Sequence, residues 1–312
     1  MTEKRLVPSL LVALPSKTLP AAKMASDTLK EGLRAMALNS VNTNMGAMIA
    51  LQNLQVTNNE LSTVQNRINT GKMVSSAKDN GAIFAIAQGQ RAELGALNAV
   101  KDSLNRGQSA VDVALSAGES VSDLLAQLKE KALSATDKSL TTSARSALNE
   151  DFKAIRDQIA TVVANAKFNG VNLLDNSTTT NGFKALSNTA GSTIKVAGEN
   201  LLLGGTNVTV TATTTIGTST LAATALTAVN ASIDKVSASL ARLGTGSKSF
   251  ATHLTFVGKL QDSIESGIGN LVDADLAKES ARLQALQTKQ QLGVQALSIA
   301  NSSTSILLGL FR

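Results

Sequence analysis

The sequence predicts a mainly α-helical fold, in which both chain ends form a long antiparallel helical bundle or coiled coil around a small β-rich insertion. The apolar residues are chiefly Ala, Leu, Val and Ile, and the 2% aromatic content is entirely Phe. This composition is typical of long helices that pack through small side chains. Apolar heptads also occur near both ends, whereas the middle is rich in Ser and Thr.

The first helix is predicted over residues 41–70, with Gly71 as its C-cap. Its apolar side chains recur every seven residues, and two more widen the stripe. A narrow stripe of this kind needs another surface to bury it, because a lone helix is marginal in water. The residues of the stripe are Leu54, Leu61, Ile68, Leu51 and Val64.

Two further helical regions are expected over 79–118 and 121–166, interrupted at Gly107 and at Gly118-Glu119-Ser120. Between 176 and 227 the texture changes, and Thr193–Val196 and Val208–Thr211 alternate with the period of two that half-exposed strands show. This middle segment is therefore predicted to contain short strands.

Helical patterning resumes near Leu226, with a predicted break at Gly244-Thr245-Gly246 and a continuation over 250–266. A final helix from Asp273 carries a second apolar heptad. Its members are Leu276, Leu283 and Leu297, with Gln290 at the remaining heptad position and Leu286 beside it.

The two terminal heptads are expected to pair with each other, and the polar positions Asn58, Gln65 and Gln290 can fix the register of that pairing. The predicted organisation has four parts: an atypical leader, a terminal helical inner core, an outer helical domain and a short variable β-rich segment. These parts are residues 1–35, residues 36–75 with 270–312, residues 76–175 with 228–269, and residues 176–227.

The leader differs in composition from the rest, because all three prolines lie in its first twenty residues. Lys4 and Arg5 precede an apolar stretch, Leu6–Leu14, which resembles a short signal peptide. Pro8 interrupts that stretch and no clean cleavage site follows. We favour the alternative that translation begins at Met36 and that the leader is a start assigned too early, or a disordered extension.

Several classes of function are disfavoured by composition. The chain has no Cys and one His, so thiolate chemistry and multi-His metal sites are excluded. The net charge of +6 comes from scattered side chains without a basic run or interleaved aromatics, which argues against nucleic acid. No stretch is apolar for long enough to span a membrane. Neither a cofactor nor a membrane partner is expected.

Two polar groups could suggest chemistry, and each has a simpler interpretation. His253 has Ser249 and Thr255 nearby, but no acid partner or oxyanion loop is indicated, so we expect an ordinary packing histidine. Asp273, Asp275 and Glu279 could bind a metal ion. At a predicted helix start, however, such residues are expected to cap the helix and complement its dipole.

Several separated blocks of the chain resemble the bacterial flagellin family, in its compact alphaproteobacterial form. The resemblance covers about 36–175 and 228–312. It rests on Met36–Asn44, Asn66–Gly71, Ser76–Ala82, Ala166–Val171, Phe256–Asp262, Asn270–Asp275, Gln284–Asn301 and Leu307–Arg312.

The resemblance implies a structural subunit, not an enzyme, that polymerises with many identical copies into an extracellular flagellar filament for swimming. It also implies a flagellar export apparatus, an export chaperone, a filament cap and junction proteins as partners. The alternative is a hook–filament junction protein of the same helical design. The expected assembly interface comprises Leu51, Leu54, Leu61, Val64, Ile68, Leu276, Leu283, Leu286, Leu297, Leu307, Leu308, Leu310, Phe311 and Arg312.

Overall fold

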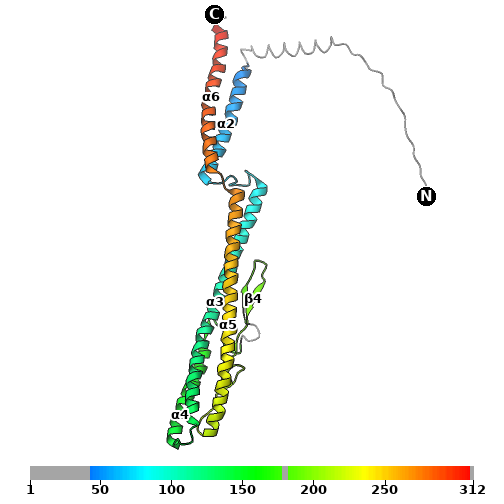
Figure 1. The fold of residues 1–312 in the computed structure, drawn as a ribbon. Helices are drawn as coiled ribbons and strands as arrows, with labels where there is room; N and C mark the ends of the chain where they lie inside the picture. The colour runs from blue at the N-terminus through cyan, green and yellow to red at the C-terminus, as the bar shows by residue number, and fades with distance from the viewer. Residues whose placement is uncertain (1–42, 178–181, 310–312) are drawn as a thin grey trace, which may run out of the picture. The chain divides into compact units, whose positions relative to one another are not determined.

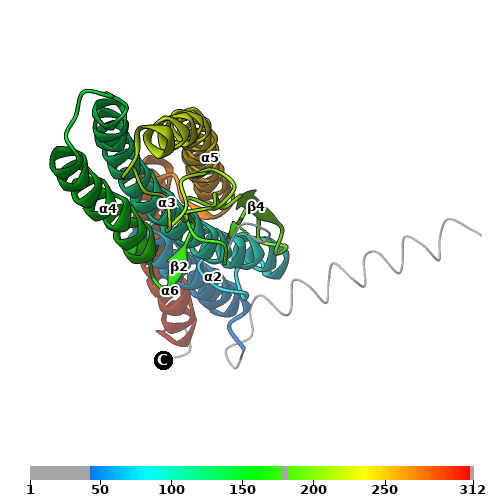
Figure 2. The same cartoon turned by 90° about the horizontal axis from the view of Figure 1, so that it is seen from below.

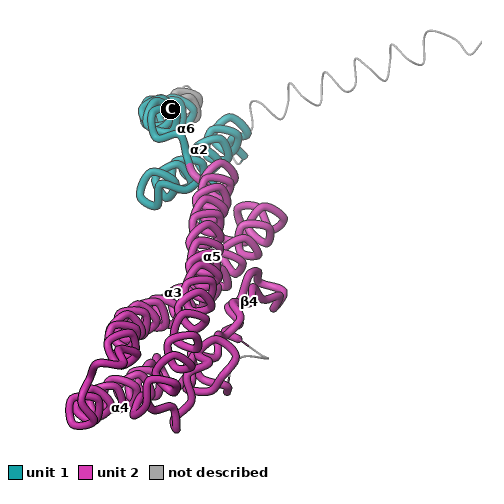
Figure 3. The backbone as a smooth tube through the Cα atoms, turned by 60° about the horizontal axis from the view of Figure 1, so that its bottom comes forward, with its two compact units in different colours: residues 1–75, 274–312 teal, residues 76–273 magenta. Residues whose placement is uncertain are grey.

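The computed structural model describes residues 43–177 and 182–309, with side chains described up to residue 302 (Figure 1). The chain divides into two compact units, shown in two colours in Figure 3. Unit 1 comprises residues 1–75 and 274–312, and unit 2 comprises residues 76–273. The leader, the proposed start Met36 and the terminal residues 310–312 lie outside the described residues.

Unit 1 consists of two helices from opposite ends of the chain, α2 (Met45–Thr70) and α6 (Leu276–Gly309), which pack against each other. The Asn44 side chain caps α2 by accepting a hydrogen bond from the Ala47 amide. Gly71 ends the helix with a φ of 68°, a left-handed conformation that glycine adopts without steric cost. Both helices were predicted, and the C-cap at Gly71 is confirmed.

Unit 2 contains three long helices: α3 (Gly81–Ala135), α4 (Thr142–Asn165) and α5 (Ser219–Val272). α3 packs against both of the other helices, and Figure 2 shows the three side by side in the view along the bundle. Together with unit 1 they confirm the mainly α-helical fold class.

The predicted breaks at Gly107, at 118–120 and at 244–246 are wrong, because α3 and α5 run through all three places without interruption. Close packing explains these glycines. A Cβ on Gly107 would lie 2.9 Å from Phe250 Cε2, one on Gly118 would lie 2.6 Å from Leu240 Cδ2, and one on Gly246 would lie 2.7 Å from Val196 Cγ1. Each of the three glycines leaves room for a side chain of another element.

The predicted helix over 121–166 is also wrong as a single element, since the chain turns at 136–141 between α3 and α4. The buried Arg145 guanidinium donates hydrogen bonds to the carbonyls of Ala135, the last residue of α3, and of Asp137 in the turn. Asp137 Oδ1 accepts from the Ser139 amide within the turn. The bond to Ala135 satisfies a carbonyl that the helix end leaves without an intrahelical partner, and the other two hold the turn.

The segment between α4 and α5 forms two small antiparallel hairpins. Strands β1 (Lys167–Phe168) and β2 (Val171–Asn172) are joined by Asn169-Gly170, whose φ angles of 50° and 81° suit a tight hairpin turn. Strands β3 (Phe183–Leu186) and β4 (Thr193–Val196) pair in register from Phe183 with Val196. The predicted strand at 193–196 is confirmed.

The predicted strand at 208–211 is wrong. Val208 and Val210 are buried and alternate with more exposed threonines, but the segment forms only an isolated parallel bridge between Val208 and Leu203. The Thr209 amide donates to Ser232 Oγ on α5, and the Thr209 hydroxyl donates to the Ala228 carbonyl. Helix α5 also begins earlier than the predicted 226, at Ser219, because Thr218 caps it.

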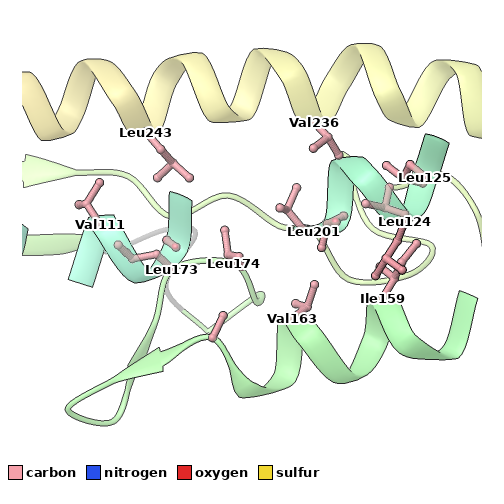
Figure 4. Packing of buried hydrophobic residues seen from close by; sticks show 14 of the residues in the cluster. Val111, Leu124, Leu125, Ile159, Val163, Leu173, Leu174, Leu201, Val236 and Leu243 are labelled. Atoms are coloured by element: carbon pink, nitrogen blue, oxygen red, sulfur yellow. The ribbon is translucent and has the colours of Figure 1, made fainter. Parts of the chain in front are cut away.

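The core of unit 2 lies where α3, α4 and α5 meet the connecting segment. Figure 4 shows side chains from all three helices pointing toward Leu173, Leu174 and Leu201 of that segment. These three leucines are at most 1% exposed. The segment between α4 and α5 therefore contributes to the core instead of lying only on its surface.

Candidate assembly surface

Helices α2 and α6 bury one heptad stripe each. The least exposed side chains are Thr57 and Val64 on α2, and Glu279 and Leu286 on α6. Alternating steps of three and four residues connect the buried and half-buried positions, as in a coiled-coil seam. These positions are 47, 50, 54, 57, 61, 64 and 68 on α2, and 279, 283, 286, 290, 293, 297 and 300 on α6.

Polar contacts fix the antiparallel register of this pair near both ends and in the middle. Asn44 Nδ2 donates to the Ala300 carbonyl at 2.7 Å, and Gln290 Nε2 donates to Asn58 Oδ1 at 2.8 Å. Between them, a Cβ on Gly293 would lie 3.2 Å from Leu54 Cδ1, so the two helices approach closely there. A shift of one heptad would break all of these contacts.

An ion pair joins the end of α2 to the start of α6. Arg67 Nη1 lies 3.2 Å from Glu279 Oε1, and the two side chains are 27% and 11% exposed. The cation lies in the last turn of α2 and the anion in the first turn of α6, so each also complements the dipole of its own helix. Glu279 Oε2 is buried without a hydrogen-bond partner among the described residues.

Most of the predicted interface residues with described side chains lie in the seam. Leu51 and Leu276 do not: they are 54% and 49% exposed. Leu307 and Leu308 lie within α6 beyond the described side chains, and Leu310, Phe311 and Arg312 lie outside the described residues. The buried or half-buried members are Leu54, Leu61, Val64, Ile68, Leu283, Leu286 and Leu297.

Sequence reasoning missed Thr57 and misplaced two polar positions. Asn58 and Gln65 are exposed beside the seam, whereas Thr57 is 2% exposed within it. The Thr57 hydroxyl donates to the Asn53 carbonyl, which satisfies it inside α2. The step of three residues from Leu54 identifies position 57, and that spacing was the available signal.

Exposed large apolar side chains concentrate on unit 1. Of the fourteen found among the described residues, ten belong to this smaller unit. Exposed apolar side chains in this number favour an interaction surface on unit 1, because water solvates them poorly. The ten are Met45, Met48, Ile49, Leu51, Val56, Met73, Leu276, Leu292, Val294 and Ile299.

The polar residues considered for chemistry have structural partners. His253 Nε2 lies 2.7 Å from the Ser187 carbonyl, and its ring contacts Phe256. Asp275 accepts hydrogen bonds from the Ala277 and Lys278 amides, so it caps α6. Across residues 43–177 and 182–309 no group of His, Asp or Glu is arranged to hold a metal ion. No described helix could cross a membrane.

A register-locked helical pair that still exposes many apolar side chains is typical of a structural subunit, a class of protein that assembles with other chains. Comparisons with known proteins identify the family. Residues 41–179 match the bacterial flagellin N-terminal helical region, and residues 226–311 match the bacterial flagellin C-terminal helical region. The chain belongs to the bacterial flagellins and is a structural subunit of the flagellar filament.

Two relatives of known name, at 58% and 38% identity, agree with this membership. Flagellin FljK of Caulobacter vibrioides is 58% identical over 277 residues, which cover 89% of this chain and all of that protein. A flagellin of Brucella melitensis is 38% identical, with 88% of this chain and 99% of that protein covered. The crystal structure of Bacillus cereus flagellin aligns with a TM-score of 0.43 at 21% identity, covering 50% of this chain and 88% of that chain. Nothing in these comparisons favours a junction protein.

Proposed function

We propose that the copies of this flagellin join through unit 1, with α2 and α6 forming an inner layer of the filament and the helices of unit 2 an outer one. The observation that carries the proposal is the concentration of exposed apolar side chains on unit 1. Burying them against further copies would remove them from water, at about 25 cal/mol for each Å². Head-to-tail contacts of this kind generate open helical polymers.

The proposal extends to the surroundings of the filament. The chain is exported through the flagellar export apparatus, with an export chaperone that covers the apolar surface of unit 1 before assembly. It polymerises outside the cell beneath a filament cap and is attached to junction proteins. It has no catalytic activity. The structural partners of His253 and Asp275 support this last point.

Charged substitutions on the two exposed members of the predicted interface test the proposal. Leu51→Asp and Leu276→Asp place a carboxylate on the apolar surface of unit 1, where burial against another copy would leave the charge unpaired. The matched control is Leu221→Asp, because Leu221 is 47% exposed but belongs to unit 2. Electron microscopy after salt-induced polymerisation should show filaments from the wild type and from the control.

The two unit 1 variants should stay unpolymerised at concentrations at least about tenfold above the wild-type threshold. If they form filaments as readily as Leu221→Asp does, unit 1 is not the assembly surface.

A further inference from the structure

Sulfur is confined to one end of this chain. All six Met residues lie within residues 1–73, and the chain has no Cys. Unit 2 therefore contains no sulfur atom, and it also contains no Tyr or Trp. Its buried core is built from Ala, Leu, Val, Ile and Phe. A mild oxidant therefore finds its most reactive side chains outside unit 2.

Three of the six Met side chains lie in the part of the chain that the structure describes, and all three are exposed. Met45, Met48 and Met73 are 45%, 61% and 39% exposed, and each belongs to unit 1. Met45 lies three residues before Met48 and four before Ile49, so these side chains are neighbours on the surface of α2. A thioether in contact with solvent is open to attack by an oxidant.

Oxidation of Met45 and Met48 would change the exposed surface of α2 without disturbing the helical pair. None of the buried or half-buried seam positions of α2 and α6 is a Met. The seam is packed by side chains such as Leu54, Val64 and Leu286, which contain no sulfur. The pair is therefore expected to keep its packing when the two thioethers are oxidised.

We infer that Met45 and Met48 form an oxidation-sensitive site that controls assembly: peroxide converts their thioethers to sulfoxides, and the oxidised chain does not polymerise. The inference rests on the proposed function, since it requires the apolar surface of unit 1 to be buried between copies. Hydrogen peroxide transfers one oxygen atom to the sulfur, so an S–O bond forms, the O–O bond breaks and water leaves. The sulfur loses two electrons and the peroxide gains them. A sulfoxide is polar, and its burial without a hydrogen-bond partner is unfavourable.

The test treats unpolymerised full-length chains with hydrogen peroxide, locates each sulfoxide by peptide mass spectrometry and then adds polymerising salt. Oxidised wild-type chain should need a concentration at least about tenfold higher than untreated chain to form filaments. The double variant Met45→Leu with Met48→Leu should polymerise equally before and after treatment, because Leu has a similar volume and no sulfur. A second double variant, Met45→Gln with Met48→Gln, places unbranched polar side chains at both positions and should match the oxidised wild type without peroxide.

The matched control is Met73→Leu, which removes one exposed Met of unit 1 outside α2 and should stay as sensitive to peroxide as the wild type. Oxidised wild-type chain that polymerises as readily as untreated chain would overturn the inference and leave the proposed function standing. Equal loss of assembly in the treated Leu double variant would also overturn it, because the effect would then come from oxidation elsewhere.

Treatment of preformed filaments tests the proposed function separately. Met45 and Met48 should oxidise at least about tenfold more slowly in filaments than in the unpolymerised chain, because burial between copies shields them from the peroxide. Equal rates would show that this surface of unit 1 stays in contact with solvent after assembly, and the proposed function would then fail.

Discussion

Replacing Gly107 by Ala should destabilise unit 2, although alanine is the better helix former. The added methyl group would lie 2.9 Å from Phe250 Cε2 and 3.0 Å from Phe183 Cε1, well inside the 3.5–4.0 Å that two carbon atoms prefer. Phe250 is 1% exposed and packs edge-to-face against Phe183, so the rings have little room to withdraw. Such overpacking costs about 1–3 kcal/mol.

The gain in helix propensity offsets about 1 kcal/mol of that cost. The net loss is therefore up to about 2 kcal/mol, or a fall in Tm of up to about 8 °C for a unit of this size. The control is Gly95→Ala in the same helix, where no atom lies within 4 Å of the new Cβ. It should raise Tm by about 1–4 °C, because only the propensity changes.

Far-UV circular dichroism during heating measures both variants against the wild type. The informative quantity is the difference between them, since both exchange Gly for Ala within α3. If Gly107→Ala raises Tm as much as Gly95→Ala does, the rings of Phe183 and Phe250 do not pack closely against Gly107. The explanation given above for the uninterrupted helix would then fail.

Two ionic contacts give further predictions. Arg67→Ala should destabilise the α2–α6 pair by about 1–3 kcal/mol, because it leaves the largely buried Glu279 carboxylate unpaired, whereas Lys153→Ala, which removes an exposed pair, should leave Tm unchanged. Burial raises the pKa of Glu199, but hydrogen bonds and the charge of Arg242 outweigh it and hold the pKa below its ordinary 4.5. The ionised Glu199 carboxylate therefore stabilises the folded chain above pH 4.5, and this stabilisation is lost as the pH falls through the lowered pKa. Glu199→Gln should lower Tm at about pH 7 and reduce the further loss of Tm toward about pH 3; an unchanged pH profile would contradict this assignment.

The seam of unit 1 could be predicted from the sequence because a heptad is a local pattern with one geometric solution. Leu54, Leu61 and Ile68 imply a stripe on one face of a helix, and Leu283 and Leu297 imply its partner. The same pattern cannot say where a helix projects beyond its partner. Leu276 continues the heptad but is 49% exposed in the first turn of α6.

The continuity of α3 and α5 could not be predicted locally. Glycine lowers helix propensity by about 1 kcal/mol, so Gly107, Gly118 and Gly246 favour breaks in any local interpretation. The structure uses them as contact points, and the neighbours that require them come from distant parts of the chain, such as Val196 beside Gly246. Tertiary packing decided these three positions.

The segment between α4 and α5 was the least predictable part of unit 2. Its Ser and Thr content suggested surface strands, and the alternation at Val208 and Val210 does distinguish buried from exposed side chains. The alternation does not show which group pairs with the backbone. The Thr209 amide donates its hydrogen bond to Ser232 Oγ of α5, where a strand would donate to a carbonyl of a neighbouring strand. A period of two in the sequence predicts which side chains are buried, but it does not predict that the segment pairs with another strand in a sheet.

The central claim is that the terminal helices of unit 1 carry the assembly, and truncation at the carboxyl terminus tests it most directly. Purified full-length chain and a variant lacking residues 302–312 are brought to the same polymerising salt concentration and imaged by electron microscopy. The variant removes the apolar cluster from Leu307 to Phe311 and leaves unit 2 unchanged. The full-length chain should form filaments and the truncated chain should form none; equal filament formation by both would contradict the account.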